Sequence, residues 1–386
     1  MSAENILLSI VVPTKNRTKF LKSFIELVYS FKNAEIELVI QDNSDTNEDI
    51  LSFLSDARYS DIVYHFDNRP MPVIANSELA IMHAHGKYIC FMGDDDLLSG
   101  KLYNFVKWMD KNEYESAIFN HASYNWPGVT HKAHKFPSLQ IPLFKGEVKE
   151  VCVEKAFKQL LNIGAVSMGE MPQLYQSVVL RERLDDVYRK TGTYFPGPSP
   201  DMAISAALAK VVTKYVYCDL PLVSSGASPK SAAGLGAQHK HEGKLKDMSF
   251  LPEDTEATWE KKIPLIWTGP TIYAESCLKA LRAMGADSDV TKFNYSYFYA
   301  YFAVFCRSHK DLLMPFLKDR TACSLVKYYG SIVRIFLFRS RRFLRNLLVT
   351  RFRMFGTYID DVQTSYDAQK LIDKQMELCD LEFLLN

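Results

Sequence analysis

The first hundred residues alternate between apolar runs and amphipathic segments, and this alternation restricts the fold more than any other feature of the chain. Residues 6–12 form a continuous, β-branched apolar run that Pro13 closes, which is typical of a strand buried on both faces. Residues 18–31 repeat apolar side chains at helical spacing, and residues 36–44 return to strand character. This order predicts a βαβ unit and therefore a sheet with parallel strands.

The same alternation continues to about residue 111 and then loosens. The elements it predicts are helices over 48–54, 73–84, 101–111 and 148–162 and strands over 62–65, 87–92 and 116–120. We expect a loop over 121–147, and residues 224–243 are so rich in Ser, Gly and Ala that they predict a mobile loop. The fold class that follows is α/β, with a Rossmann-like mixed sheet flanked by helices.

At 386 residues the chain is long for one compact domain, so more than one structural unit is expected. We divide it into residues 1–110 and 111–250, the two halves of the α/β domain, and residues 251–386, a mainly helical C-terminal region. Ligands of such α/β sheets bind beyond the carboxyl ends of the strands. The first half carries three polar clusters at that edge.

Overall composition excludes several classes of function. Lys and Arg total 46 against 45 for Asp and Glu, which gives no reason to expect a nucleic-acid-binding protein. No segment offers about 18 uninterrupted apolar residues, so no membrane span is expected. The seven cysteines are scattered without a paired spacing, which indicates free thiols and a cytoplasmic location.

Three consecutive carboxylates, Asp94 to Asp96, follow the apolar run of residues 87–92. Adjacent carboxylates repel one another, and a divalent cation removes that cost. Hard oxygen ligands suit Mg²⁺ or Mn²⁺, which also bind phosphate oxygens of a substrate. The triplet therefore predicts a metal site for a phosphate-bearing ligand. The alternatives are a solvated acidic turn, or Asp96 as the cap of the following helix.

A second polar cluster follows the strand predicted over residues 36–44. Asp42 can accept the imide N–H of a uracil or thymine ring, and the backbone of residues 13–17 borders the same edge of the sheet. Asp42, Asn43 and Ser44 are also favourable turn residues, so a purely structural role stays open.

Several stretches together resemble the inverting family 2 glycosyltransferases, which have the GT-A fold. The resemblance covers roughly residues 6–110 and is carried by "SIVVPTKNR", "ELVIQDNSD" and "NSELAIMHAHGKYICFMGDDD", and more loosely by "SPDMAISAALA". It implies a hexosyltransferase-type enzyme that moves a sugar from a nucleoside diphosphate sugar and inverts the anomeric carbon. A UDP- or dTDP-sugar is the favoured donor.

The resemblance also implies roles for individual residues. Asp42 would bind the nucleobase, and Asp94 and Asp96 would be the DxD pair that holds Mn²⁺ or Mg²⁺ and the diphosphate. Many relatives end this motif in two acids that would align with Asp95 and Asp96, so the identity of the metal ligands stays open. The remaining residues expected to bind the nucleotide sugar are Pro13, Thr14, Asn16, Arg17, Asn43, Asn76 and Asp95.

Asp201, in the first turn of a predicted helix, is the candidate catalytic base. In an inverting displacement the acceptor hydroxyl must lose its proton as it attacks C1, so a carboxylate must stand across from the metal. Relatives often carry Glu-Asp here, whereas this chain has Pro200-Asp201. The alternative role is that of an acid favoured at a helix N-terminus by the macrodipole.

The loop over 224–243 resembles the segment that closes over the donor in such enzymes. Lys230, Ser231 and His239 are its candidate diphosphate-binding residues. Closure would exclude water and limit hydrolysis of the donor. Lone Lys and His side chains in a loop can also be merely solvated.

Residues 331–353 contain seven arginines and no acid, with apolar residues on a separate sector of the predicted helix. Such a basic amphipathic helix can lie at the inner face of an anionic plasma membrane, as a peripheral contact. The alternative is a helix that packs its apolar face on the core and leaves its basic side solvated. A membrane contact would suit a lipid-linked glycan acceptor and synthesis of a bacterial surface polysaccharide such as an O-antigen or capsule.

Two rival functions stay open. Nucleotidyltransferases also hold metals with a Gly-Asp-Asp turn, although that turn lies in an antiparallel hairpin, whereas Asp94 follows a βαβ series. A non-catalytic scaffold that binds sugar nucleotides or glycans could keep the same fold. Substitution of Asp201 distinguishes these, because only an enzyme has turnover to lose.

Overall fold

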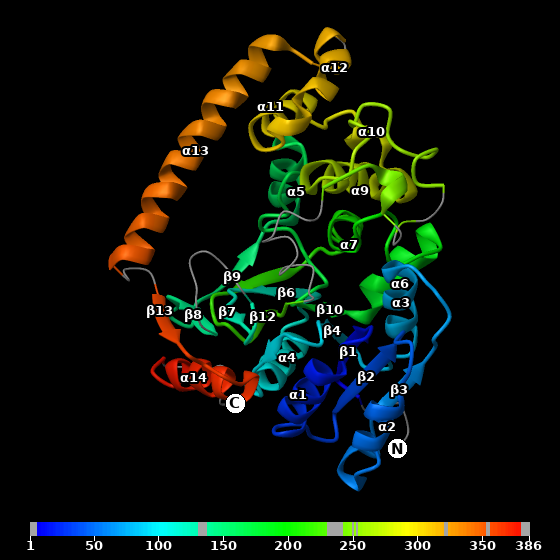
Figure 1. Ribbon diagram of the computed structural model, residues 1–386, viewed down its shortest axis with the longest axis vertical. Coiled ribbons are helices and arrows are strands. Elements are labelled where there is room, and N and C mark those ends of the chain that lie inside the picture. Colours follow the sequence, from blue (N-terminus) through cyan, green and yellow to red (C-terminus); the bar gives the residue numbers. More distant parts are fainter. Residues whose placement is uncertain are drawn as a thin grey trace.

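The computed structural model describes residues 6–129, 137–229, 242–248, 251, 254–319, 323–352 and 356–379. These residues form two sheets, helices that pack on the larger sheet, and a mainly helical part that lies above the sheets in Figure 1. The predicted α/β class, with a mixed sheet flanked by helices and a mainly helical C-terminal region, is confirmed.

The larger sheet has eight strands in the order β3-β2-β1-β4-β10-β6-β11-β9. Its strands are β1 Leu8–Thr14, β2 Ile36–Asp42, β3 Val63–Phe66, β4 Tyr88–Phe91, β6 Ser116–Phe119, β9 Val148–Val151, β10 Val178–Leu180 and β11 Tyr215–Cys218. The strands β3, β2, β1 and β4 are parallel, whereas β10 is antiparallel to β4 and to β6. The carboxyl ends of β1, β2 and β4 therefore meet at one edge.

Helices cover both faces of this sheet because the strand side chains are apolar on both faces. One core lies under α1, α2 and α4, and a second lies under α3, α6 and α7 on the opposite face. Their bounds are α1 Thr18–Tyr29, α2 Glu48–Leu54, α3 Val73–Met82, α4 Lys101–Lys111, α6 Arg181–Thr191 and α7 Pro200–Leu208. The elements predicted up to residue 120 are confirmed to within two residues at their ends.

The smaller sheet has the order β13-β8-β7-β12-β5. Its strands are β5 Leu97–Leu98, β7 Ser123–Asn125, β8 Ser138–Pro142, β12 Val223–Ala227 and β13 Gly356–Asp360. β5 directly follows the acidic triplet, and β12 pairs with it through Val223 and Leu98. This pairing brings residues 223–227 against the triplet.

Three predictions beyond residue 120 are wrong. The expected loop over 121–147 contains β7 and β8, and the expected helix over 148–162 begins with β9, so that α5 covers only Val153–Asn162. The first residues of the expected mobile loop over 224–243 belong to β12. These short strands have partners far away in the sequence, and local composition does not reveal such partners.

The C-terminal region has its own core, which is formed with α5. Its elements are α9 Gly269–Ala283, α10 Asp287–Val290, α11 Tyr295–Phe305, α12 Met314–Lys318 and α13 Leu325–Phe352, with short 3₁₀ turns at Leu245–Asp247 and Arg307–Leu313 and, earlier in the chain, at Ala57–Tyr59. In Figure 1, α13 runs down one side of the molecule from α12 towards β13.

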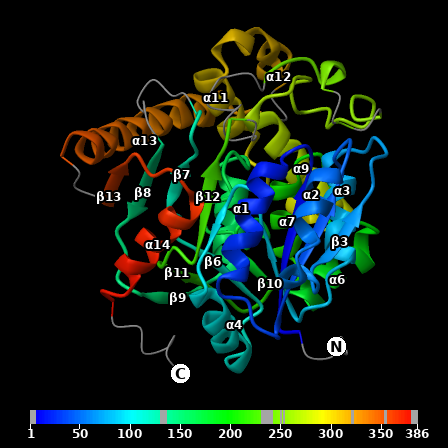
Figure 2. The same cartoon turned by 60° about the horizontal axis from the view of Figure 1, so that its bottom comes forward.

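The chain then returns to the first half. β13 pairs with β8, and α14 (Ser365–Met376) places Ala368, Ile372 and Met376 in the core under α1 and α4. Figure 2 shows α14 beside the sheets, well away from α11 and α12. The predicted region 251–386 is thus not a single structural unit, because its last elements bury their apolar faces against the N-terminal half.

None of the described helices combines the length and the apolar composition that crossing a bilayer requires. The seven cysteines, all of them among the described residues, form no disulfide bond.

Candidate active site

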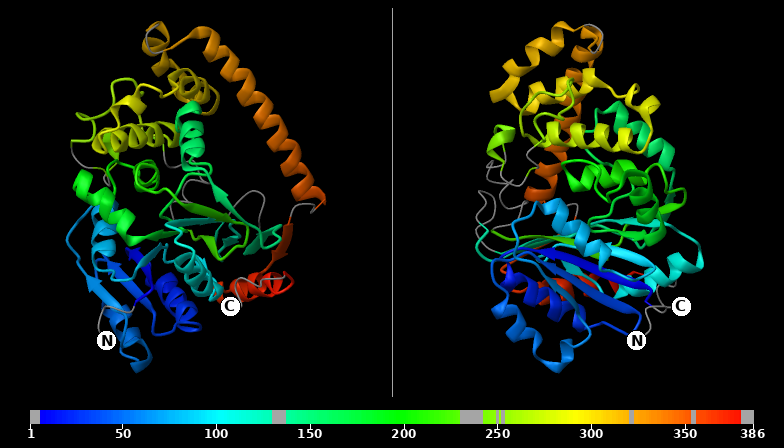
Figure 3. Two further views of the ribbon diagram at one scale, coloured as in Figure 1. Left: turned by 180° about the vertical axis from the view of Figure 1, so that it is seen from behind. Right: turned by 90° about the vertical axis from the view of Figure 1, so that its right-hand side faces the viewer.

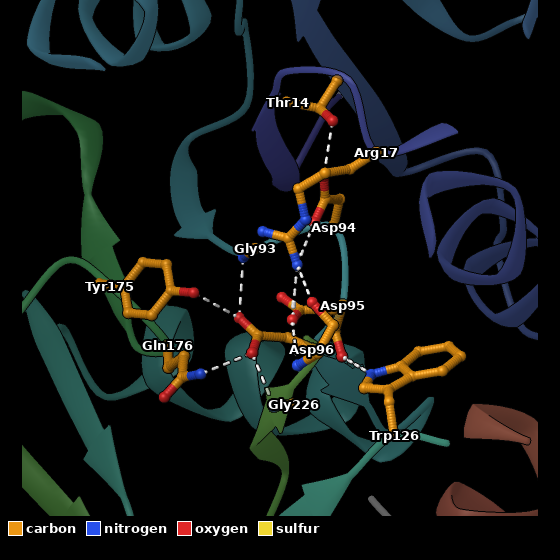
Figure 4. A network of polar contacts seen from close by, with 11 residues as sticks. Thr14, Arg17, Gly93, Asp94, Asp95, Asp96, Trp126, Tyr175, Gln176 and Gly226 are labelled. Atoms are coloured by element: carbon orange, nitrogen blue, oxygen red, sulfur yellow. Dashed lines mark hydrogen bonds and ion pairs between the residues drawn. The ribbon is translucent and has the colours of Figure 1, made fainter. Parts of the chain in front are cut away.

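The acidic triplet lies between β4 and β5, and all three of its side chains are buried. A buried carboxylate is costly unless hydrogen bonds or opposite charges compensate it. The partners of Asp94, Asp95 and Asp96 therefore indicate what each residue is placed to do. Figure 4 shows these partners.

Asp94 and Asp95 share one arginine. Arg17 Nη2 lies 3.1 Å from Asp94 Oδ1 and 2.5 Å from Asp95 Oδ2. Thr14 Oγ1 donates a hydrogen bond of 2.5 Å to Asp94 Oδ2. The turn after β1, which was predicted to border the ligand, thus lies directly on the two acids.

The start of the segment predicted to close over the donor, residues 224–243, also contacts Asp95. Ser228 N donates to Asp95 Oδ2 at 3.0 Å, and Arg17 Nη2 donates to Ser228 Oγ at 2.7 Å. Trp126 Nε1 donates to the carbonyl oxygen of Asp95 at 2.7 Å. Lys230, Ser231 and His239 lie outside the described residues.

Asp96 is held differently, because four donors surround its carboxylate. Gln176 Nε2 and Gly226 N donate to Oδ1 at 2.8 and 2.9 Å. Gly93 N and Tyr175 Oη donate to Oδ2 at 2.8 and 2.9 Å. A carboxylate has about four lone-pair sites. Asp96 thus anchors the turn through the protein's own donors, and its role as a metal ligand together with Asp94 stays a prediction.

Burial governs the electrostatics of the triplet. Burial raises the pKa of Asp94 to about 7, which the charge of Arg17 opposes and the charge of Asp95 reinforces. Burial and the charge of Asp95 raise the pKa of Asp96 to about 7, although its four donors favour the ionised form. The cluster holds more negative charge than Arg17 neutralises.

The arrangement of Asp94 and Asp95 fits a divalent cation if Arg17 moves. Asp94 Oδ1 is buried and accepts no hydrogen bond from the described residues. It faces, with Asp95 Oδ2, the same guanidinium nitrogen. No group of three His, Cys, Asp or Glu residues in the described part of the chain is arranged to hold a metal. Two carboxylates suffice where a diphosphate supplies further oxygens.

Asp42 lies at the end of β2, in register with Thr14 of β1. Ser44 N donates to its Oδ1 at 2.8 Å, and Tyr64 Oη donates to its Oδ2 at 2.9 Å. Asp42 therefore serves the turn, as in the structural alternative, while each oxygen keeps acceptor capacity. Burial and the charge of Asp42 raise the pKa of Tyr64.

Hydrogen bonds within the protein occupy most of the polar side-chain atoms of Asn43, Asn16 and Asn76. Asn43 Nδ2 donates to the carbonyl oxygens of Asp67 and Arg69 at 2.5 and 2.8 Å. Asn16 has φ of 55° and exchanges hydrogen bonds with Asp45.

Asn76 is the one of these three with a free acceptor. Its Nδ2 donates to the carbonyl oxygens of Thr14 and Gln41 at 3.3 and 3.5 Å, and its buried Oδ1 accepts nothing within the described residues. Asn76 thus bridges the ends of β1 and β2, and its carbonyl oxygen is the atom left for a ligand.

Asp201 lies in the first turn of α7 and is partly exposed. Its surroundings desolvate the carboxyl group, and this burial raises its pKa to about 6. The negative charge of Asp201 contributes to the raised pKa values of Tyr175 and Tyr273. Tyr175 also donates to Asp96, so the charges of Asp201 and of the triplet, about a hundred residues apart in the sequence, both act on this phenol.

Sequence reasoning missed several residues of this site, namely Tyr64, Trp126, Tyr175, Gln176, Gly226 and Ser228. They contact the acids through backbone groups or through single polar atoms, and they lie in stretches without a motif. Among these residues, only Gly226 has a clear reason for its residue type. A Cβ atom at this position would lie 1.7 Å from the carbonyl oxygen of Asp95, so a glycine is required.

The chain matches known proteins over its first part. Residues 9–162 match the model of glycosyl transferase family 2. An uncharacterized glycosyltransferase of Rickettsia felis is 32% identical over 143 residues, which are 36% of this chain and 22% of the relative. Another, of Rickettsia conorii, is 31% identical over 144 residues, with the same shares covered. The chain thus spans about a fifth of the length of these relatives.

Solved structures also resemble the fold. S. aureus TarS 1–349 in complex with UDP matches with a TM-score of 0.45 at 16% identity, over 85% of this chain and 90% of that chain. The mannosyltransferase PcManGT from Pyrobaculum calidifontis, in complex with GDP-Man and Mn²⁺, matches with a TM-score of 0.38 at 14% identity, over 85% and 86% of the two chains.

Proposed function

We propose, from the match of residues 9–162 to the model of glycosyl transferase family 2, that the chain is an inverting, metal-dependent glycosyltransferase that uses a nucleoside diphosphate sugar. One observation carries the proposal beyond the family. The buried acids Asp94 and Asp95 share one cation, Arg17, and the charge of Asp201 acts on Tyr175, which donates to Asp96. This arrangement supports a phosphate-binding site with a candidate base beside it.

The donor lies, in this proposal, over the ends of β1 and β2. Asp42 accepts an N–H of the nucleobase with its remaining lone pairs, which favours a UDP- or dTDP-sugar. Asn76 Oδ1, buried and without a donor in the described residues, faces the ligand between the two strands. Pro13, Thr14, Asn16 and Asn43 shape this edge through their backbone and through loop contacts.

Mn²⁺ or Mg²⁺ would be held by Asp94 and Asp95, with Asp96 as the anchor of the turn. When bound, the cation supplies the positive charge that stabilises the departing nucleoside diphosphate. Arg17 leaves the two carboxylates and pairs with the diphosphate, which offers the bidentate acceptor geometry that a guanidinium favours. Lys230, Ser231 and His239 are proposed to reach the diphosphate from the segment after β12.

Asp201 is the proposed catalytic base. A carboxyl group with a pKa of about 6 is mainly ionised at neutral pH and is a stronger base than an ordinary aspartate. It takes the proton of the acceptor hydroxyl while that oxygen attacks C1 from the side opposite the diphosphate. One displacement with one base inverts the anomeric centre.

The acceptor is proposed to be a lipid-linked glycan on the cytoplasmic face of a bacterial plasma membrane, as in the synthesis of an O-antigen or capsule. An enzyme of such a pathway must meet its acceptor at a membrane surface. The exposed apolar and basic residues of α13 support this part of the proposal.

Purified protein incubated with a panel of sugar nucleotides and Mn²⁺ tests the enzyme class. We expect one donor to be hydrolysed slowly and to raise the melting temperature. Asp201→Asn should remove at least about a hundredfold of the turnover and leave donor affinity nearly unchanged. Asp49→Asn, an exposed acid paired with Lys22, is the matched control.

Three results would contradict the proposal. A scaffold would bind a donor without any turnover in the wild-type protein. A nucleotidyltransferase would leave the nucleoside monophosphate on the product, which mass spectrometry detects. A retained anomeric configuration, read by NMR of the product, would exclude the inverting mechanism.

A further inference from the structure

Helix α13 packs on the protein only along its first part. Tyr328, Ser331 and Ile335 are buried against the helical core, where α13 lies beside α11. Residues 336–344 are exposed around the whole circumference of the helix. The left view of Figure 3 shows α13, in orange, along the margin of the molecule.

The apolar face of α13 points away from the core. At about 100° per residue, Val326, Val333, Leu337 and Leu344 fall within about 40° of one another and opposite Ile335. Their exposed fractions are 85%, 60%, 60% and 59%. Tyr329, Phe336 and Phe343 flank them and are exposed as well. We call these seven residues the outer stripe.

At the same spacing Arg341 and Arg334 fall about 60° and 80° from the centre of the outer stripe, so they border it, whereas Arg339 and Arg342 fall on the side of Ile335. Arg334 lies over the ring of Tyr297 and Arg339 over that of Phe305, both on α11, at 5.4 and 4.7 Å. The first part of α13 thus packs apolar side chains on the core, as in the alternative arrangement, but the outer stripe stays exposed. Such an exposed apolar surface is uncommon in a soluble monomer.

The charge of α13 distinguishes between the partners that could cover the outer stripe. α13 contains six arginines and one lysine and no acid. Two copies joined through the outer stripe would bring arginines of both copies together without any carboxylate to pair with them. Anionic headgroups beside an apolar interior complement both the arginines and the stripe.

We propose that the outer stripe of α13 lies in the interfacial plane of an anionic membrane. The stripe enters the boundary between headgroups and acyl chains, while Arg341 at its border contacts the headgroups and the charge of Arg342 adds to the attraction. The inference deepens the proposed function by naming the surface and the residues that meet it. It depends on that function only for the statement that the acceptor is lipid-linked.

Vesicle flotation with the full chain, in the absence of any donor, tests this proposal. We expect binding to vesicles of phosphatidylglycerol and phosphatidylcholine, weakened by salt, and little binding to phosphatidylcholine alone. Leu337→Glu with Leu344→Glu should weaken binding at least about tenfold. Arg341→Gln with Arg342→Gln should weaken the preference for anionic vesicles by about fivefold per arginine.

The matched control is Leu143→Glu with Leu378→Glu, two exposed leucines outside α13 with exposed fractions of 64% and 87%. This variant should bind vesicles as the wild type does, and all variants should keep the wild-type melting temperature. Equal binding by the stripe variant and the wild type overturns the proposal. A dimer in sedimentation that the stripe variant abolishes also overturns it, in favour of a second copy. Because no donor is present, neither outcome depends on transferase activity.

Discussion

Asp201 combines partial exposure with a carboxyl pKa raised to about 6. Only its ionised form can accept a proton, so we expect kcat/KM to fall as the pH drops through about 6. Below that value the rate should decrease about tenfold per pH unit. The pH profile of the wild type with a fixed donor and saturating Mn²⁺ measures this. A profile without an inflection between about pH 5 and 7 would exclude Asp201 as the base.

Arg17 occupies the position between Asp94 and Asp95 where a cation is proposed to bind. Arg17→Gln removes this competing charge, so the donor-free variant should bind Mn²⁺ about tenfold more tightly than the wild type. Its affinity for the sugar nucleotide should decrease by a similar factor, because the diphosphate loses a partner. Electron paramagnetic resonance of free Mn²⁺ measures the first effect, and calorimetry measures the second.

Lys15→Gln is the control for this pair of measurements, because Lys15 is a neighbouring cation that donates to Asn43 and has no recorded contact with the triplet. It should leave Mn²⁺ affinity unchanged. If Arg17→Gln also leaves it unchanged, Arg17 does not occupy the cation site.

At the residue scale, the sequence predicted which polar clusters meet, but not which of their acids are held by hydrogen bonds from the protein. Asp94, Asp42 and Asp201 were expected at this edge because each follows or begins a strongly patterned element. The role of Asp96 could not be predicted, because its donors come from Gln176 and Gly226, about eighty and a hundred and thirty residues away. Hydrogen bonds between distant segments leave no local pattern.

Strand β12 is the element that couples the acidic triplet to the segment after it. Ser225 Oγ donates to Gln176 Oε1 at 2.7 Å, and the next residues donate through Gly226 N and Ser228 N to Asp96 and Asp95. Gly226 and Ser228 thus hydrogen-bond the triplet directly, and Ser225 holds Gln176, which itself donates to Asp96. A shift of β12 must therefore move the acids, and a shift of the acids must move β12.

Gly226→Ala tests this coupling. Its Cβ would overlap the carbonyl oxygen of Asp95, so either β12 or the turn must move. We expect at least about a tenfold loss of donor affinity and a melting temperature lower by several degrees. Gly330→Ala is the matched control, since it has open space in α13 and should gain about 0.5–1 kcal/mol in stability. Wild-type donor affinity in Gly226→Ala would show that β12 does not position the triplet.

At the element scale, buried parallel strands were predictable and short strands of the smaller sheet were not. β1, β2 and β4 are continuous apolar runs, so burial on both faces identifies them. β7 and β8 have three and five residues, and β8 pairs with β13 from the far end of the chain. Their pairing is decided by tertiary contacts rather than by composition.

For the whole molecule, the return of β13 and α14 makes the last residues part of the first core. Ile372 is fully buried there, and Ser99, three residues after the acidic triplet, donates to Asp373 at 2.6 Å. The C-terminal end and the candidate site are therefore parts of one packed unit. The proposed boundary at residue 251 does not separate two independently folding regions.

Ile372→Ala measures this dependence. It should cost about 2–5 kcal/mol of unfolding free energy, and donor binding should be lost at the same lowered temperature as the fold. Leu378→Ala, an exposed residue shortly after α14, should change stability by less than about 0.5 kcal/mol. Unfolding of α14 that leaves donor binding intact up to the wild-type temperature would contradict this account.

Helix α13 is fastened at both of its ends, by its packing against α11 at one end and by the chain that continues into β13 at the other. At about 1.5 Å per residue its 28 residues span about 42 Å. A helix of this length, lying on a bilayer through its outer stripe, resists tilting along its axis. The catalytic edge would then be held at one height above the bilayer, so that only acceptor sugars at a suitable distance from their lipid could be extended.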